Sequence, residues 1–291
     1  MKLLAKFNLI LATLFGAGAV LVGFASYQFL MQNARDQVVA QAELMIESAR
    51  STRQYTADDL APLLDKVPDD DTQFLPETIP FYAATTTFNY LRKDHPDYAY
   101  KEAALNPTNL RDRSEDWQAD LINYFQNNAG TKRLVGERDT ATGRMLYIAY
   151  PIAVDASCLQ CHGDPGSAPA SIVHRYGNVN GFGWKPNEIS AAQIVSVPMA
   201  VPIGIARNAF RSLVAYLIGI FVVAMLAVDC ALFVLVIRPV RKLSKVADRI
   251  SSGETGIAEI PVAGRDEISA VTASFNRMYV SLQKAFQMLK D

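Results

Sequence analysis

The 291-residue sequence predicts an α+β domain between two membrane-spanning helices, followed by an all-α coiled coil. Three observations predict this arrangement. Two runs of apolar residues are each long enough to cross a bilayer, which takes about 20 residues. The chain between them alternates helical and strand-like periodicities, as in an α+β domain. After the second run, apolar residues recur at alternating spacings of three and four, which is typical of a coiled coil.

The composition excludes several classes of protein. The formal net charge is −1, and a near-neutral chain gives no case for nucleic-acid binding. There are only three cysteines, two of them in one short motif and the third, Cys230, in an apolar run. A disulfide framework is therefore excluded.

The first predicted element, residues 1–31, is an N-terminal transmembrane helix. After Lys2 and Lys6 the chain carries no charge from Phe7 to about Met31. A cleaved signal peptide is the alternative, with Gly23-Phe24-Ala25 as the cleavage site, although the run is longer than the usual apolar region of roughly 7–15 residues. The second transmembrane helix is predicted at residues 213–237, where only Asp229 interrupts the apolar run.

The segment between the spans, residues 32–212, carries the α+β pattern. Apolar periodicity predicts helices at 33–64, 79–93 and about 114–127, the first ending at Pro62 and Pro68. Strands are predicted around Tyr98 and Tyr100, at 132–137, at 145–154 and at 191–201, the middle two joined by a hairpin turn at 139–143. Glycine, proline and asparagine make residues 163–187 a predicted loop.

The chemistry is carried by Cys158-Leu159-Gln160-Cys161-His162, a C-x-x-C-H run that predicts covalent attachment of one c-type haem. The thiols of Cys158 and Cys161 can each add to a vinyl group, and His162 binds the iron as axial ligand. A zinc site would need a second pair of ligands. A redox dithiol normally opens a helix after a strand, whereas Gly163-Asp164-Pro165-Gly166 follows here.

The sixth position of the iron is left open by the sequence. The candidate ligands are two histidines and three methionines, with a vacant or water-filled site as a further alternative: His95, His174, Met45, Met145 and Met199. His174 follows the motif most closely and reaches the iron most easily. The position of His95 before Pro96 indicates a helix end, where a charged histidine is ordinary. Methionines in strands usually lie in the core.

Flanking charges and the haem motif predict the orientation. Basic residues precede the first span and follow the second, which places both termini in the cytoplasm. They are Lys2, Lys6, Arg238, Arg241 and Lys242. Arg207 and Arg211 oppose this weakly. C-type haem resembles what bacteria attach outside the cytoplasmic membrane, so residues 32–212 are predicted to be periplasmic and the protein to cross the inner membrane twice.

The C-terminal residues 238–291 form two predicted helices joined by a connector at 253–264. Apolar seams recur in both helices, at Val240, Leu243, Ala247 and Ile250 and at Ile268, Val271, Phe275, Met278 and Leu282. This pattern resembles a HAMP linker, and Phe275-Asn276-Arg277-Met278 matches that family's second helix. The resemblance implies a parallel four-helix bundle of two chains, hence a homodimer. A pair of amphipathic surface helices is the alternative.

Several short motifs between the spans are similar to those of the Tll0287-like, or DUF3365, family. They are Arg53-x-Tyr55-Thr56 with Pro62-Leu63-Leu64, Asn106-Pro107-Thr108-Asn109, the run from Cys158 to Pro165, and Tyr176-Gly177 through Gly181-Phe182-Gly183-Trp184. The resemblance covers about residues 35–202 and implies a PAS-like c-type haem domain. In that family a cysteine from the long N-terminal helix can complete the iron's coordination. No cysteine lies between Met1 and Cys158, so another group or none fills that position.

These observations predict a signal-transduction sensor and no enzyme. The haem's redox state, or bound NO, CO or O2, is expected to act through HAMP. No output domain precedes Asp291, so the output belongs to a cytoplasmic kinase or other protein in trans, or the sequence is truncated. The alternative is a membrane-anchored periplasmic cytochrome c that carries electrons to a redox partner. A haem enzyme such as a peroxidase would need a distal acid–base residue, and the sequence identifies none.

Overall fold

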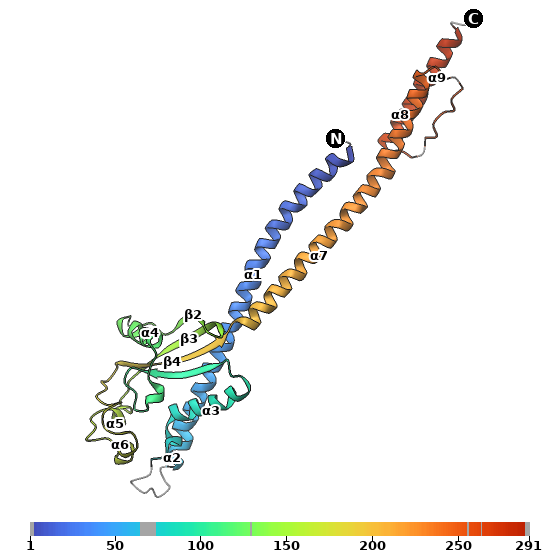
Figure 1. The fold of residues 1–291 in the computed structure, drawn as a ribbon. Helices are drawn as coiled ribbons and strands as arrows, with labels where there is room; N and C mark the ends of the chain where they lie inside the picture. Colours follow the sequence, from blue (N-terminus) through green and yellow to red (C-terminus); the bar gives the residue numbers. More distant parts are fainter. Residues whose placement is uncertain (1–2, 65–73, 129, 255, 263, 289–291) are drawn as a thin grey trace. The chain divides into compact units, whose positions relative to one another are not determined.

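The computed structural model describes residues 3–64, 74–128, 130–254, 256–262 and 264–288 (Figure 1). These residues form two compact units. The first described below, Tyr27–Phe210, contains the sheet and the C-x-x-C-H motif. The second comprises Met1–Ser26 and Arg211–Asp291, and its described residues are helical apart from the segment between its last two helices.

The sheet of the first unit has four antiparallel strands in the order β1-β4-β3-β2. Their bounds are Ala99–Ala104 for β1, Leu134–Thr140 for β2, Gly143–Ala153 for β3 and Ile189–Pro198 for β4. The mixed helix and sheet content confirms the α+β prediction. The predicted hairpin is confirmed with a tighter turn, because Thr140 already pairs with Gly143. The last strand ends earlier than predicted, since helix α7 begins at Ala200.

Helices cover both faces of this sheet. Helices α1, Leu3–Tyr55, and α3, Pro80–Asp94, pack on one face, and helix α4, Asp116–Asn127, packs on the other. Side chains of a strand point alternately to the two faces. Accordingly Val195 and Val197 of β4 join the core with α1 and α3, whereas Ile194 joins the core with α4.

The predicted first span and the predicted helix at 33–64 are parts of one continuous helix. After α1 come a π-helical turn, η1 at Thr56–Leu60, and a short helix, α2 at Ala61–Leu64. The helix end expected at Pro62 is not found. In the π-helical turn the Ala61 amide donates to the Thr56 carbonyl, and this shifted register accommodates a proline one residue later. Pro68 lies outside the described residues.

The prediction of a loop at 163–187 is wrong in one part. Helix α6, Ala170–Tyr176, begins after Pro169 and ends at Gly177, whose φ is 79°. The seven residues between these two breakers contain neither glycine nor proline, and Ile172 buries its side chain. Composition averaged over the whole segment conceals this short helix. Three single-turn elements complete the unit: η2 at Pro76–Thr78, η3 at Leu110–Asp112 and α5 at Leu159–His162.

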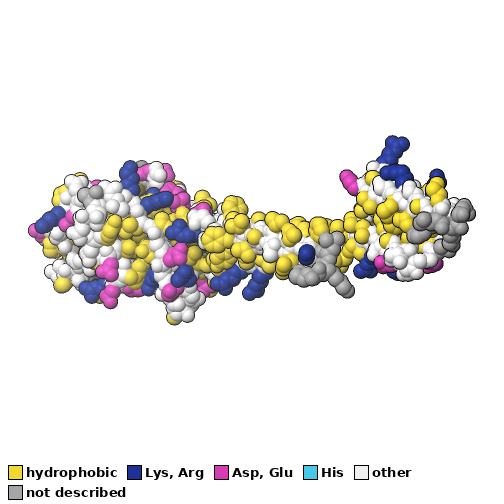
Figure 2. All heavy atoms as spheres, turned by 90° about the horizontal axis from the view of Figure 1, so that it is seen from above, with side chains coloured by type: hydrophobic (Ala, Val, Ile, Leu, Met, Phe, Trp, Pro, Cys, Tyr) yellow, Lys and Arg dark blue, Asp and Glu magenta, His cyan; other side chains and the backbone are white. Residues whose placement is uncertain are grey.

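Two helical stretches, Leu4–Leu64 and Ala200–Ser251, are long and apolar enough to cross a membrane. The second consists of α7 at Ala200–Leu232, η4 at Phe233–Ile237 and α8 at Arg238–Ser251. Figure 2 shows hydrophobic side chains exposed along these helices, whereas acidic and basic side chains gather on the sheet domain. Two helices that can span a bilayer therefore flank the sheet domain in sequence.

In the second unit, the segment after α8 folds back onto helix α9, Glu267–Met288. Ile257 and Ile260 bury their side chains there. The Asn276 side chain accepts from the Ile260 amide at 3.1 Å and donates to the Ile260 carbonyl at 2.8 Å. The Tyr279 hydroxyl accepts from the Ile257 amide. The connector is thus held by backbone hydrogen bonds to one face of α9.

Candidate functional site

One helical turn presents the C-x-x-C-H motif. The Cys158 carbonyl accepts from the His162 amide at 2.9 Å, and the Leu159 carbonyl accepts from the Gly163 amide at 3.0 Å. Positions three and four apart share a face of a helix. Cys158, Cys161 and His162 therefore lie on the same side of the turn. Both thiols are free and half-buried.

Asp155 fixes the beginning of this turn. Its carboxylate accepts from the amide and the hydroxyl of Ser157 and, at 3.3 Å, from the Cys158 amide. These hydrogen bonds, those from Ser157 above all, lower the pKa of Asp155. An ionised carboxylate at the start of a helical turn satisfies amides that have no partner within the helix.

The imidazole of His162 is held by three neighbours. Its Nδ1 lies 2.7 Å from the Gly181 carbonyl and 3.2 Å from the Thr108 hydroxyl, and its ring stacks on Trp184 with centroids 4.0 Å apart. A carbonyl can only accept, so Nδ1 carries the proton and Nε2 keeps a free lone pair. Burial lowers the pKa of His162, although the hydrogen bond to Gly181 opposes the shift. The ring is thus neutral and oriented, as a metal-binding histidine must be.

Three segments distant in the sequence meet at this imidazole. The turn at residues 106–109 contributes Thr108 and also Asn106, whose side chain accepts from the Gly181 amide at 3.2 Å. The segment 181–184 pairs with the motif through two backbone hydrogen bonds. The Gly183 amide donates to the Gly163 carbonyl at 2.8 Å, and the Trp184 amide donates to the His162 carbonyl at 3.1 Å. Three of the short motifs quoted from the sequence, at residues 106–109, 158–165 and 176–184, therefore meet at one site.

Gly181 occupies the tightest point of this contact. Its φ is +82°, and a Cβ added there would lie 2.0 Å from the Thr108 hydroxyl and 2.7 Å from the Thr108 Cα. Only glycine fits such a close backbone approach at a positive φ.

A cavity of about 310 Å³ opens beside the motif, and Cys158, Cys161 and His162 form part of its wall. Aromatic and aliphatic side chains form much of the remaining wall, namely Phe74, Ile79, Phe81, Tyr82, Ile172, Tyr176 and Trp184. Burial raises the pKa of the Cys161 thiol, with a further contribution from Cys158. A neutral Cys161 thiol, a second thiol and a free imidazole nitrogen on an apolar wall fit what a covalently attached haem requires.

A bare metal ion fits these residues less well. Among the residues that the structure describes, no three His, Cys, Asp or Glu side chains are grouped closely enough to ligate one, the motif included. A structural zinc site would need four such ligands.

None of the five residues suggested for the sixth iron position lines this cavity. His95 and His174 are exposed, on the end of α3 and on α6. Met145 and Met199 are buried in the sheet domain, Met199 within the core beneath α1. Met45 lines a separate groove between α1 and α3. The described part of the cavity wall offers oxygen donors instead, among them Tyr82, Glu102, Asp112 and Tyr176.

Glu102 is the site residue that sequence reasoning missed. It lies in the middle of β1, is 6% exposed, and belongs to the cavity wall. The sequence carries a signal for its burial, because residues two apart in a strand point to the same face. Glu102 therefore shares a face of its strand with Tyr100 and Ala104.

Fold and site together define a domain that carries a C-x-x-C-H cavity and is flanked by two helices able to cross a membrane. The family model for Tll0287 matches residues 31–198, and the chain belongs to the Tll0287-like family. A HAMP domain follows at residues 234–284. These matches confirm both resemblances noted in the sequence.

A solved structure, the crystal structure of the cyanobacterial heme-protein Tll0287, is similar to this chain at 18% identity and a TM-score of 0.42. The match covers 55% of this chain and 94% of that one. At this level the similarity adds no argument about function. A comparison with curated proteins found no match.

Proposed function

We propose that this chain is a membrane-bound sensor that detects redox state or a diatomic gas through one covalent c-type haem and relays the signal through HAMP. The observation that carries the proposal is the oriented, neutral imidazole of His162 beside two thiols on the wall of one apolar cavity. A Tll0287-like domain followed by HAMP is the organisation of a signalling protein.

Each residue of the motif has a separate role. The thiols of Cys158 and Cys161 would hold the haem, each through one C–S bond formed by addition of its S–H across a vinyl group, with the hydrogen passing to the neighbouring carbon. His162 would hold the iron through Nε2, because the Gly181 carbonyl keeps the proton on Nδ1. When bound, the haem supplies a one-electron couple and a site for diatomic gases. The aromatic side chains of the wall would pack against the bound group.

Charge near the spans supports a periplasmic sensor domain with both termini in the cytoplasm. Lys2 and Lys6 lie before the first apolar stretch, and three basic residues follow the second: Arg238, Arg241 and Lys242. Positively charged flanks stay on the cytoplasmic side of a membrane. The sheet domain lies between the two stretches and is therefore exported in this proposal, where c-type haem is attached.

The exposed seam of α9 supports a homodimer. Val271 and Met278 are 56% and 54% exposed, whereas Asn276 and Tyr279 face the connector and are buried. An apolar stripe left open on one side of a helix is what a coiled-coil partner covers. A second copy is the partner that HAMP implies, and the output protein then reads the bundle.

The first experiment tests haem attachment. The double variant Cys158→Ser, Cys161→Ser, made in a host that attaches c-type haem, should retain no haem after denaturing electrophoresis. The native chain should stain for haem in the same gel. Persistent staining of the double variant would refute the proposal. Spectra of the native protein, oxidised, reduced and with CO or NO, then separate gas sensing from redox sensing, because only an open iron site binds gas.

A membrane-anchored electron carrier is the alternative function, and HAMP argues against it because a carrier needs no heptad seam. Phe275→Asp places a charge in that seam, where burial without a partner is costly. If the protein is a sensor, this variant should lose its signalling or keep it locked in one state. Its haem spectrum and its midpoint potential should stay unchanged. If electron delivery changes and no cellular response does, the carrier is the better description.

A further inference from the structure

One carboxylate of the cavity wall, that of Glu102, is buried. Glu102 is 6% exposed, and its Oε1 accepts a hydrogen bond from the Tyr100 hydroxyl. Its Oε2 has no hydrogen-bond partner among the residues that the structure describes, and the Arg53 guanidinium lies 3.9 Å away. A buried carboxylate oxygen without a hydrogen bond is costly, so a group of this kind calls for a reason.

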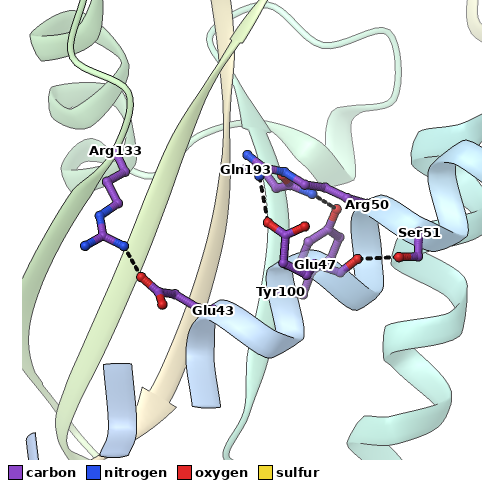
Figure 3. Close-up of polar contacts among 7 residues, drawn as sticks. All are labelled: Glu43, Glu47, Arg50, Ser51, Tyr100, Arg133 and Gln193. Carbon is purple, nitrogen blue, oxygen red and sulfur yellow. Dashed lines mark hydrogen bonds and ion pairs between the residues drawn. The ribbon is translucent and has the colours of Figure 1, made fainter. Parts of the chain in front are cut away.

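The neighbours of Glu102 connect it to α1 by two routes. In the direct route, Arg53 of α1 lies over the ring of Phe81 at 4.0 Å and reaches Glu102 from there. In the second, Tyr100 accepts from Gln193 at 2.9 Å, and Gln193 accepts from Arg50 of α1 at 3.3 Å (Figure 3). Arg50 and Arg53 are three residues apart and precede the π-helical turn at Thr56–Leu60. The carboxylate thus has two connections to the helix that leads to the first apolar stretch.

The charged and titratable groups that interact with Glu102 are Arg53 from α1, Tyr100 from β1 itself and Asp112 from η3. Tyr82 from α3, Arg111 from η3 and His162 from α5 line the same cavity. Burial is the largest influence and raises the pKa of Glu102 to about 7, against the attraction of Arg53. Burial also raises the pKa of Asp112 and, well above its ordinary range, that of Tyr100.

We propose that Glu102 is a proton-binding site of the cavity, and that its protonation is transmitted to α1 through Arg53. This inference rests on the proposed function, because the protonation of Glu102 is coupled to the charge of the haem. When that group gains one electron from an external one-electron reductant, the Glu102 carboxylate takes one proton from water and forms one O–H bond. The neutral acid no longer attracts the Arg53 guanidinium, so the contact between the cavity and α1 loosens.

The midpoint potential of the haem-loaded full chain in detergent, titrated at several pH values around 7, tests the proposal. The native potential should fall with rising pH by up to about 59 mV per unit, the value for one proton per electron. Glu102→Gln should lose this slope near pH 7. Glu43→Gln is the matched control, because Glu43 lies on α1, is also paired with an arginine, Arg133, and does not line the cavity (Figure 3).

Arg53→Gln tests the transmission to α1. Because Arg53 lowers the pKa of Glu102, its removal should move the pH-dependent range of the potential to higher pH, with the slope retained. If Glu102→Gln keeps the native slope, or if Arg53→Gln leaves the range where it was, the inference is wrong even though haem is bound and the proposed function stands.

An infrared measurement tests the proton site without haem. The difference spectrum of the full chain between pH 8 and pH 6 should contain the C=O stretch of a protonated carboxyl group that is missing in Glu102→Gln and present in Glu43→Gln. Failure to attach haem would refute the proposed function and leave this band in place. A band that persists in Glu102→Gln would refute the proton site.

Discussion

The imidazole of His162 is prepared for its role by neighbours rather than by its position in the motif alone. The Gly181 carbonyl fixes the proton on Nδ1, Thr108 supports the same nitrogen, and Trp184 covers one ring face. Such partners set the orientation and basicity of a ligand histidine. Single residues outside the motif therefore decide whether His162 can serve as a ligand.

Gly181→Ala should disturb the imidazole of His162, which the Gly181 carbonyl contacts directly. A Cβ at this position would meet Thr108 at 2.0 Å, and a non-glycine residue at positive φ costs on the order of 1–3 kcal/mol. The expected result is a lower melting temperature together with an altered haem absorption spectrum. Gly183→Ala is the control, since its φ is +77° and its Cβ would meet nothing within 4 Å. Equal spectral changes in both variants would contradict the role given to the Thr108 contact.

Glu102 should also make the folded state depend on pH. Its pKa is near its ordinary value of 4.5 in the unfolded chain and about 7 in the folded one, so the folded state binds the proton more tightly. The resulting stability is fully present below pH 4.5 and is lost as pH rises through about 7, by a few kcal/mol at most. Thermal unfolding of the chain without haem should therefore show a smaller pH dependence in Glu102→Gln than in the native protein. An identical dependence in both would mean that Glu102 is ionised throughout.

At the scale of elements, helix α9 has two faces with different partners. The connector covers one face through Asn276 and Tyr279, and the apolar seam at Val271 and Met278 remains open. A helix can serve two such interfaces because side chains three and four apart form separate stripes. The connector is therefore a stable part of the single chain, and the seam is available to a second copy.

Asn276→Ala should release the connector. The variant leaves the amide and the carbonyl of Ile260 without their partner, and each unpaired buried group costs about 1–3 kcal/mol. Hydrogen exchange at Ile257 and Ile260 should become faster. Ser274→Ala on the exposed face of α9 is the control and should leave the exchange unchanged. Protection that survives in Asn276→Ala would show that the buried isoleucines alone hold the connector.

The two apolar stretches share a polar contact within the second unit. The Asn8 amide donates to the Asp229 carboxylate at 3.1 Å, and Phe15 packs on Phe221 nearby in sequence. A hydrogen bond between helices in a membrane contributes about 0.6 kcal/mol on average. A double-mutant cycle of Asn8→Leu and Asp229→Leu, measured by unfolding in mixed micelles, should give a coupling of that order. Thr13→Val should show no coupling to Asp229→Leu, because the Thr13 hydroxyl bonds only to its own helix. Additive effects at Asn8 and Asp229 would contradict the contact.

At the scale of the whole molecule, the proposed signal runs from the cavity to α1, and from the sheet domain through α7 to HAMP. Glu102 contacts α1 through Arg53, and β4 leads into α7 at Ala200. Both helices continue into stretches that can cross a membrane. A two-state change at the cavity thus has a covalent path to the HAMP helices, as a sensor requires.

The proposed topology makes a direct prediction for the full chain. A reporter that is active only in the periplasm should be active when fused after Pro169 and silent when fused after Asp291, because the basic flanks hold the termini in the cytoplasm. A reporter active only in the cytoplasm should give the opposite pattern. Activity of the periplasmic reporter at Asp291 would overturn the orientation, and with it the export of the sheet domain.

The sequence by itself determined what depends on neighbouring residues. Apolar runs predicted the two membrane-crossing stretches, periodicity predicted α3, α4 and the hairpin, and heptad spacing predicted the helices of the HAMP domain that the family model matches. The C-x-x-C-H spacing alone predicted the attachment of one c-type haem, and this stays a prediction. Local patterns succeed here because the period of a helix or strand is written directly in the order of residues.

Only the tertiary structure decided which distant side chains meet. Thr108 and Gly181 reach His162 across 54 and 19 residues, and Arg50 reaches Gln193 across 143. No local pattern encodes these separations, because strand order and register set them. For the same reason His174, close to the motif in sequence, lies outside the cavity, whereas Glu102, 60 residues from His162, lies on its wall. Strand β1 carries Glu102 to the cavity wall, whereas His174 lies on the exposed side of α6.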